Sequence, residues 1–327
     1  MRPPPWLGRV ARAGFLVLAV ALLLGYLWVD REQAADAVRA VGAGYAAASL
    51  AAVLVGLLAS MSVWRALLAD LGTELSLRAA FHVFFFGQLG KYVPGSVFAV
   101  AAQMELGRAQ GASRSRVATA SLVFMGVGLA VGLLVATVTL PLTSPEALRQ
   151  FGWALLALPL GLAVLAPPVL TRVVGVFLRL LRRPPLERPL TARRVGAATG
   201  WALVMWLAYG LHLWLLVRPQ GADAGGDLLL ATGGYALAWT AGFLIVLAPA
   251  GAGVREVALV AALAPVVDRP AALAVALLSR VLMTLGDLLL GAAGAAVRPR
   301  NGHRAGGPGA PMSRVTAVKQ LGKAADA

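Results

Sequence analysis

Long apolar runs occupy most of this 327-residue chain and restrict what it can fold into. Six of them approach or exceed the roughly 20 residues that a helix needs to cross a bilayer. They are residues 14–29, 45–68, 116–140, 152–171, 195–217 and 271–297. Backbone polar groups inside a bilayer must be satisfied within the structure, and runs of this length achieve that as helices. The sequence therefore predicts an all-α, polytopic membrane helical bundle.

The charge of the chain agrees with a membrane protein and excludes several other classes. Only 13% of the residues are charged, against roughly 25% in soluble domains. The net charge of +15 is spread in short clusters between the apolar runs, which argues against a nucleic-acid-binding face. Cysteine is absent and the three histidines lack metal-site spacing, so we expect no disulfide, metal or other cofactor.

Basic residues also predict the topology. We divide the chain into a basic cytosolic arm (1–13), a transmembrane domain (14–297) and a disordered cytosolic tail (298–327). With six crossings, 21 of the 29 Lys and Arg residues fall on one side and five on the other, which predicts that both termini are cytosolic. We interpret the Arg-rich loop 172–194 as a topology determinant, and Trp64 and Trp206 as interfacial anchors.

Two helix-breaking interruptions stand out against this apolar background, at residues 87–96 and 248–256. Each combines proline and glycine with charged side chains, a combination tolerated in a bilayer only where protein or a wet cavity satisfies the backbone. We interpret residues 79–108 as a re-entrant hairpin that enters from the cytosol, with Ser96 capping its second limb. An offset of 155 residues places Pro94 on Pro249, and the second hairpin enters from outside. The pattern predicts an inverted repeat with two re-entrant or broken hairpins.

Charged side chains within spans cost roughly 2.5–3.5 kcal/mol each and therefore indicate function. We expect a polar cavity that binds an anionic lipid head group through basic side chains and free helix amides. The alternative is that Glu256 with Arg280, or Arg280 with Asp287, forms a fixed internal ion pair. The candidate substrate-binding residues come from both interruptions and the last span: Gln88, Lys91, Tyr92, Pro94, Gly95, Ser96, Gln103, Glu105, Gly251, Gly253, Arg255, Glu256, Arg280 and Asp287.

The two interruptions read GKYVPGSV at residues 90–97 and PAGAGVRE at residues 249–256. In these motifs the chain resembles the lysylphosphatidylglycerol synthase transmembrane-domain family, over roughly residues 10–297. Ala250 replaces a glycine usual in that family. An acidic residue frequent in the span after the first hairpin looks replaced near Phe124 or Met125, which puts a proton- or cation-coupling role of that span in doubt.

The resemblance implies a flippase-like protein of a bacterial plasma membrane that moves a phospholipid or a polyprenyl-linked lipid between leaflets. We expect a stand-alone form without the soluble synthase domain, and therefore no enzymatic activity. Two alternatives stay open. One is an intramembrane transferase that acts on a lipid-linked phosphate with Glu105 or Glu256 as base, and the other is a membrane partner of a separate lipid-modifying enzyme. Homo-oligomerisation is compatible with all three functions.

Overall fold

The computed structural model describes residues 31–92, 98–180, 182, 185–221, 226–244 and 253–297. Every regular element within these residues is helical, which confirms the predicted fold class. Four helices among them are long and apolar enough to cross a membrane. The predicted arm, first span and tail lie outside the described residues.

The four long helices coincide with four of the predicted spans. They are α2 (Arg31–Asp70), α5 (Arg114–Thr139), α9 (Ala192–Val217) and α12 (Arg269–Ala296). Three of them begin directly after a capping side chain: Ser113, Thr191 and Asp268 each accept a hydrogen bond from a backbone amide of the first turn. Each cap satisfies an amide that would otherwise be unpaired and so fixes where the span begins.

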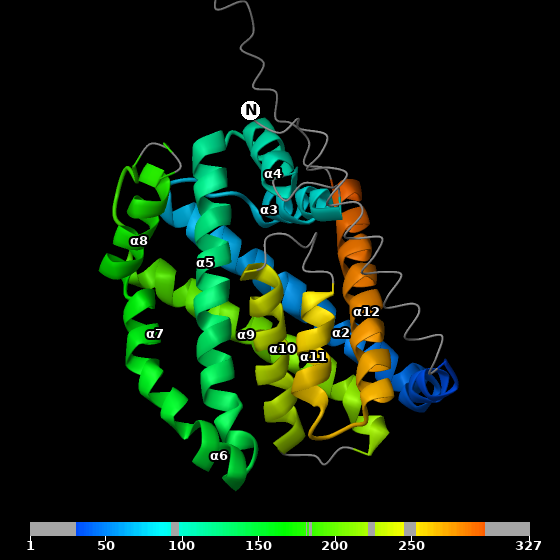
Figure 1. The fold of residues 1–327 in the computed structure, drawn as a ribbon. Coiled ribbons are helices and arrows are strands. Elements are labelled where there is room, and N and C mark those ends of the chain that lie inside the picture. The colour runs from blue at the N-terminus through cyan, green and yellow to red at the C-terminus, as the bar shows by residue number, and fades with distance from the viewer. Residues whose placement is uncertain are drawn as a thin grey trace, which may run out of the picture.

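Helices α2 and α9 run side by side in opposite directions through the centre of the bundle, and small residues allow their close approach (Figure 1). A side chain at Gly56 would collide with the ring of Tyr209. Along α12, a Cβ at Gly286 would lie 2.7 Å from Cγ1 of Val53 on α2. Membrane helices lack a hydrophobic driving force for association, because lipid is itself apolar. The close packing that small residues allow holds the helices together instead.

Two tryptophans predicted as interfacial anchors are core residues instead. Trp64 and Trp206 are fully buried. The indole of Trp64 donates to Ser121 Oγ at 3.1 Å, and that of Trp206 donates to the carbonyl oxygen of Gly128 at 3.0 Å. A partner for the indole N–H inside the bundle removes the need for interfacial water.

The first hairpin forms one end of the molecule (Figure 1). It consists of α3 (Leu77–Phe81), a π-helical turn (His82–Phe86), a 3₁₀ turn (Leu89–Tyr92) and α4 (Phe98–Ala109). The two limbs touch where Gly90 faces the backbone of α4, since a Cβ there would lie 2.8 Å from the amide nitrogen of Ala99. Glycine is therefore required for the limbs to pack together.

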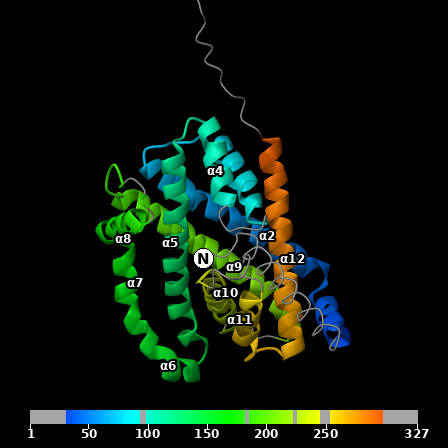
Figure 2. The ribbon, with the colours of Figure 1, turned by 45° about the horizontal axis from the view of Figure 1, so that its top comes forward.

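The second hairpin lies at the opposite end, as Figures 1 and 2 both show. It consists of α10 (Gly226–Leu244) and α11 (Val254–Leu263), packed together where Gly234 meets Ala262. Helix α12 runs along both hairpins and contacts each of them. Hairpins that point toward each other from opposite ends agree with the predicted arrangement, whereas the inverted repeat itself stays a prediction.

The predicted fourth span, residues 152–171, is broken rather than continuous. After the short helix α6 (Pro145–Phe151), a 3₁₀ segment (Gly152–Ala157) continues into α7 (Leu158–Leu165), and α8 (Pro167–Leu180) leaves at an angle of 74°. The break falls at Ala166, which is extended because proline follows it. Residues 172–180, predicted as loop, are consequently the remainder of α8.

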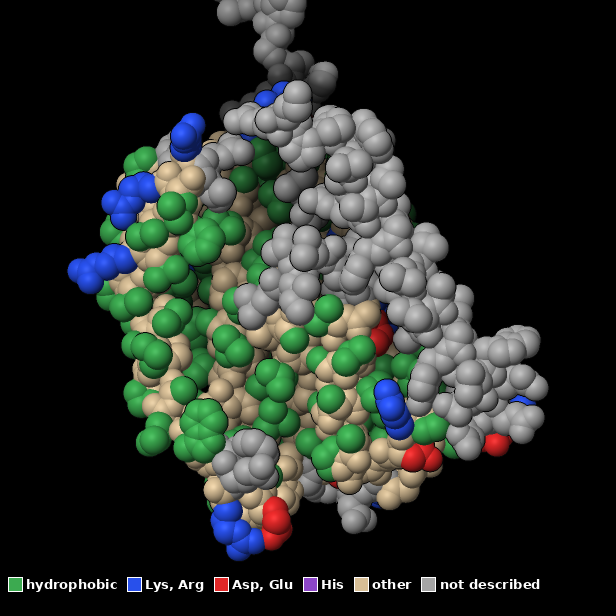
Figure 3. Space-filling view, viewed as in Figure 1, with side chains coloured by type: hydrophobic (Ala, Val, Ile, Leu, Met, Phe, Trp, Pro, Cys, Tyr) green, Lys and Arg blue, Asp and Glu red, His purple; other side chains and the backbone are tan. Residues whose placement is uncertain are grey.

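Apolar side chains cover much of the face shown in Figure 3, over α5, α7, α10 and α11. Basic side chains stand at the margins of this surface, near α8 and near α6. Such a surface agrees with a bundle surrounded by lipid and bounded by polar zones.

Candidate functional site

Helix α12 joins the two hairpins through two ion pairs. Arg280 and Asp287 lie two turns apart on one face of α12, as predicted. Asp287 accepts from the first hairpin at one oxygen, Oδ2, which lies 2.6 Å from Lys91 Nζ and 2.7 Å from the Tyr92 hydroxyl. Arg280 instead pairs with Glu256 at the start of α11 in the second hairpin. We call these five residues the α12 cluster.

The acids and the cations of the α12 cluster differ strongly in how far their side chains are exposed. The side chains of Asp287 and Glu256 are 6% and 4% exposed, whereas those of Lys91 and Arg280 are 35% and 37% exposed. The carboxylates are therefore enclosed by protein, and the cations lie on the accessible side. An approaching ligand meets positive charge first.

Glu256 has a second partner that holds it independently of Arg280. Its Oε2 accepts from the backbone amide of Gly253 at 2.7 Å. Gly253 has a φ of 87°, a left-handed conformation that favours glycine, and it directly precedes α11. The glycine motif thus places an amide and the carboxylate of Glu256 together at the start of the half-helix.

Arg255 differs from the other two cations of the predicted cavity. Its guanidinium donates to the hydroxyl of Tyr235 and lies 4.6 Å from the centroid of that ring. Among the described residues it makes no ion pair with a carboxylate. A half-buried arginine held only by an aromatic side chain retains donors for an anionic ligand.

A buried neutral network, not predicted from the sequence, lies behind Arg255. Nδ1 of His212 lies 2.6 Å from Ser49 Oγ, and its Nε2 lies 2.8 Å from Ser279 Oγ. Ser49 Oγ also donates to the carbonyl oxygen of His212, which leaves it to accept from Nδ1 and assigns Nε2 as the acceptor for Ser279. The His212 ring packs edge-on against Tyr235, with centroids 5.9 Å apart. Three spans are thereby fixed around the tyrosine that holds Arg255.

Two candidate residues of α4 do not join the α12 cluster. Glu105 is exposed and pairs with Arg114, whose guanidinium holds the pKa of this carboxyl below its usual range. Gln103 is buried but accepts from Ser121 Oγ at 2.8 Å, a contact between α4 and α5. Both side chains fasten α4 to the following span.

The remaining candidates are placed less closely. Gln88 is half-buried in the first hairpin. Pro94, Gly95, Ser96 and Gly251 lie outside the described residues. Of the two predicted alternatives for a fixed ion pair, Glu256 with Arg280 is formed, whereas Asp287 pairs with Lys91 instead of Arg280.

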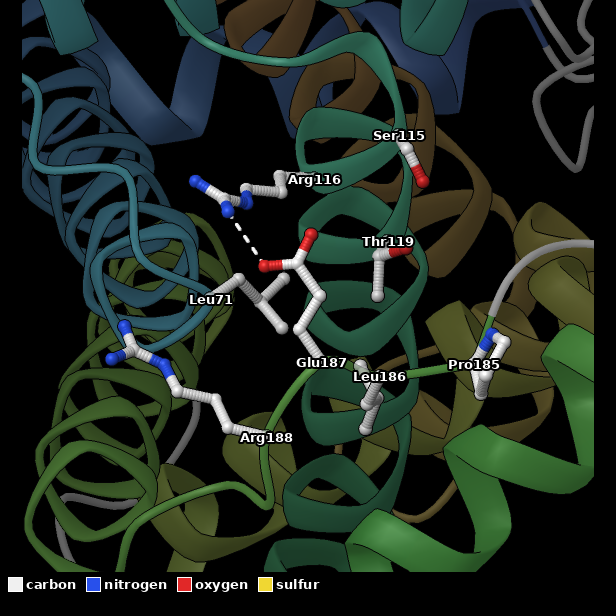
Figure 4. Close-up of a pocket in the computed structure, with 8 residues that line it drawn as sticks. All are labelled: Leu71, Ser115, Arg116, Thr119, Pro185, Leu186, Glu187 and Arg188. Atoms are coloured by element: carbon white, nitrogen blue, oxygen red, sulfur yellow. Dashed lines mark hydrogen bonds and ion pairs between the residues drawn. The ribbon is translucent and has the colours of Figure 1, made fainter.

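A pocket at the end of α2 shares no residue with the α12 cluster (Figure 4). Arg116 pairs there with Glu187 at 2.6 Å and donates to the carbonyl oxygen of Gly72, while Arg188 donates to that of Asp70 at 2.9 Å. These guanidiniums satisfy carbonyls at the C-terminus of α2. We call Arg116, Glu187 and Arg188 the α2 clamp and assign it a structural role.

Comparison with known proteins identifies the family. The sequence profile of the lysylphosphatidylglycerol synthase TM region matches residues 13–291, which include both hairpins and most of α12. No curated protein matches the chain. The profile covers well over half of the sequence, and the chain therefore belongs to the lysylphosphatidylglycerol synthase TM region family.

Proposed function

We propose that this protein is a lipid translocase that moves a phospholipid or a lipid-linked anionic head group between membrane leaflets. Arg255 is the observation on which the proposal depends, because it is a half-buried cation next to an apolar segment and pairs with no carboxylate among the described residues. A charge within the apolar part of a membrane protein is costly and usually marks a substrate or ion site. The lipid-related family supports this choice.

The two ion pairs of the α12 cluster suggest how a head group is accepted and released. When a phosphate enters, Lys91 and Arg280 turn from Asp287 and Glu256 toward it. Asp287 keeps the Tyr92 hydroxyl and Glu256 keeps the Gly253 amide, so neither buried carboxylate loses all its partners. On release the ion pairs form again, and the empty site is neutralised.

The opposed hairpins support alternating access to the two leaflets. Helix α5 begins at Arg114 and α12 at Arg269, the same 155-residue offset that relates the two interruptions. We infer an inverted repeat in which one half rocks against the other about α12 while the acyl chains remain in lipid. In this proposal the protein lies in a bacterial plasma membrane with both termini in the cytosol.

The geometry supports translocation better than transfer chemistry. A transferase needs a free base near the phosphate, but Glu105 lies at the surface between arginines and Glu256 is held by Arg280 and an amide. We therefore propose transport without covalent change. A partner role alongside a lipid-modifying enzyme is the outcome to consider if no lipid moves.

Translocation can be tested in proteoliposomes that contain phosphatidylglycerol with a fluorescent acyl chain. Dithionite destroys the fluorophore in the outer leaflet only, so continued loss of fluorescence reports exchange. We expect Arg255→Gln to slow exchange about ten-fold or more, because one charge-assisted contact is worth roughly 1.5–3 kcal/mol. Arg149→Gln is the control, since Arg149 is an exposed surface residue paired with Glu146.

Three outcomes contradict the proposal. Exchange equal to that of protein-free vesicles excludes translocation of this lipid class. Chemical conversion of the lipid without exchange favours the transferase. Equal rates for Arg255→Gln and Arg149→Gln remove Arg255 from the site.

A further inference from the structure

Helix α8 carries two adjoining apolar stripes, only one of which packs against the protein. Leu170, Val174 and Leu178 recur every four residues and are buried. Val173, Val176, Phe177 and Leu180 form a second stripe at helical spacing and are 40–74% exposed. The buried stripe accounts for the attachment of α8 to the bundle. The exposed stripe requires another apolar environment.

Two arginines border the exposed stripe. Arg172 and Arg179 are seven residues apart, on one face of α8, and both are exposed. Within the described residues neither makes an ion pair or a hydrogen bond. The arginines of the α2 clamp, in contrast, are occupied by Glu187 and by helix carbonyls. The guanidiniums of α8 are therefore available to an external anion.

The position of α8 in the bundle matches the edge of a membrane. The 3₁₀ segment (Gly152–Ala157) and α7 together rise about 24 Å, less than the roughly 30 Å of a hydrocarbon core. Helix α7 packs along α5, and the 74° turn at Ala166 directs α8 across that axis (Figure 1). Figure 3 shows basic side chains projecting at this margin. A helix that leaves a segment of this length and runs across its axis suits the boundary between the hydrocarbon and the head groups.

We propose that α8 is an interfacial helix that binds anionic phospholipids. Its exposed stripe lies among the acyl chains near the head groups, while Arg172 and Arg179 contact lipid phosphates. An apolar face next to a basic one is typical of helices that lie in the plane of an interface. Arginine also suits this place because its stem covers apolar surface while the guanidinium reaches the phosphate layer. The inference does not depend on translocation.

The absence of cysteine makes the inference directly testable in the full chain. Single variants Val176→Cys and Leu180→Cys carry an environment-sensitive fluorophore in vesicles of phosphatidylcholine and phosphatidylglycerol. Nitroxide groups at defined depths on either lipid quench the fluorophore. Leu156→Cys, near the middle of the segment formed by the 3₁₀ turn and α7, is the control for a deep position, and Glu146→Cys on α6 is the control for an aqueous one.

We expect both α8 labels at a shallow depth, with stronger quenching by nitroxide phosphatidylglycerol than by nitroxide phosphatidylcholine. The ratio of quenching by nitroxide phosphatidylglycerol to quenching by nitroxide phosphatidylcholine should fall about five-fold in each of the variants Arg172→Gln and Arg179→Gln. A depth equal to that of Leu156→Cys overturns the interfacial position. If only an aqueous quencher reaches the α8 labels, as at Glu146→Cys, the exposed stripe faces water or another protein. Shallow labels without lipid preference overturn the anionic-lipid site.

Discussion

The α12 cluster and the α2 clamp use the same kinds of side chain in opposite ways. In the α2 clamp, Glu187 is 72% exposed and its partner Arg116 is 34% exposed, so the acid lies on the open side. In the α12 cluster the acids are almost fully buried and the cations are partly open. Arg116, Lys91 and Arg280 are about equally exposed, so the difference between the two regions lies in the burial of the acid.

This difference shows which feature of an ion pair bears on function. An exposed pair such as Arg116 with Glu187 contributes roughly 0–1 kcal/mol and can be exchanged with water at little cost. A buried carboxylate requires a permanent partner, so a cation beside it can leave only if another donor stays. Tyr92 and the Gly253 amide are such donors. The clamp supports the fold, and in our proposal the cluster exchanges its carboxylates for an anionic ligand.

The largest expected effect is the loss of Arg280. Arg280→Gln leaves the buried carboxylate of Glu256 with the Gly253 amide as its remaining partner among the described residues, and we expect the free energy of unfolding to fall by about 3 kcal/mol. The matched variant Arg116→Gln should lose less than about 1 kcal/mol. Titration of SDS into mild detergent micelles measures both. Equal losses would mean that burial of the acid does not distinguish the two regions.

A double-mutant cycle separates the contact itself from the burial. For Lys91→Gln with Asp287→Asn we expect a coupling energy of about 1–2 kcal/mol, because the two groups are in contact and one is buried. For Arg116→Gln with Glu187→Gln we expect about 0.5 kcal/mol or less. The four unfolding free energies of each cycle give these values. Coupling that is as weak in the cluster as in the clamp would contradict the comparison.

The energetic cost of charge explains why much of the cluster could be predicted from the sequence. Lys91, Glu256, Arg280 and Asp287 stood out because ionised groups are rare within apolar spans, and the structure pairs the first two with the two residues of α12. Their pairing could not be predicted, since it depends on which side of α12 each hairpin meets. Spacing along α12 alone allowed Arg280 to pair with Asp287.

Neutral polar residues were not predicted as part of the site, because no energetic cost of charge marks them in the sequence. Ser49, His212 and Ser279 carry no charge penalty, and serine is frequent in membrane helices. Their network depends on contacts among α2, α9 and α12, which periodicity does not specify. Glu105 lies apart from the α12 cluster, because its distance in sequence from the interruption at residues 87–96 does not determine where its side chain lies in the fold. It lies near the end of a short helix, at the surface.

The main features of the fold were predictable because length and apolarity determine spans directly. The fourth span was the exception, since composition alone favoured a crossing at residues 152–171. The Ala166-Pro167 step decides the local conformation, and a 74° turn follows. A proline pair after a short apolar run is thus better interpreted as a boundary than as an interior kink.

A smaller effect is expected from removing the hydrogen bond between Arg255 and the Tyr235 hydroxyl. Tyr235→Phe keeps the ring under the guanidinium and removes the hydroxyl that accepts from it. We expect the protein to lose about 1 kcal/mol of stability. We also expect slower lipid exchange in the proteoliposome assay, because Arg255 is then less firmly placed. Lost stability with unchanged exchange would make Tyr235 a structural residue, like those of the α2 clamp.

The smallest effect is expected at Glu105, which is an exposed acid paired with an arginine, as Glu187 is in the α2 clamp. Its pKa in the folded protein is lowered by hydrogen bonding to Arg114, so the pair stabilises the fold fully above the unfolded-state pKa of about 4.3. This contribution is lost as the pH falls through the lower folded-state pKa. The stability difference between wild type and Glu105→Gln should therefore be constant from about pH 7 to 5 and shrink below about pH 4. A difference that grows on acidification would show that Glu105 is held in a protonated form, as a catalytic acid would be, and would reopen the transferase alternative.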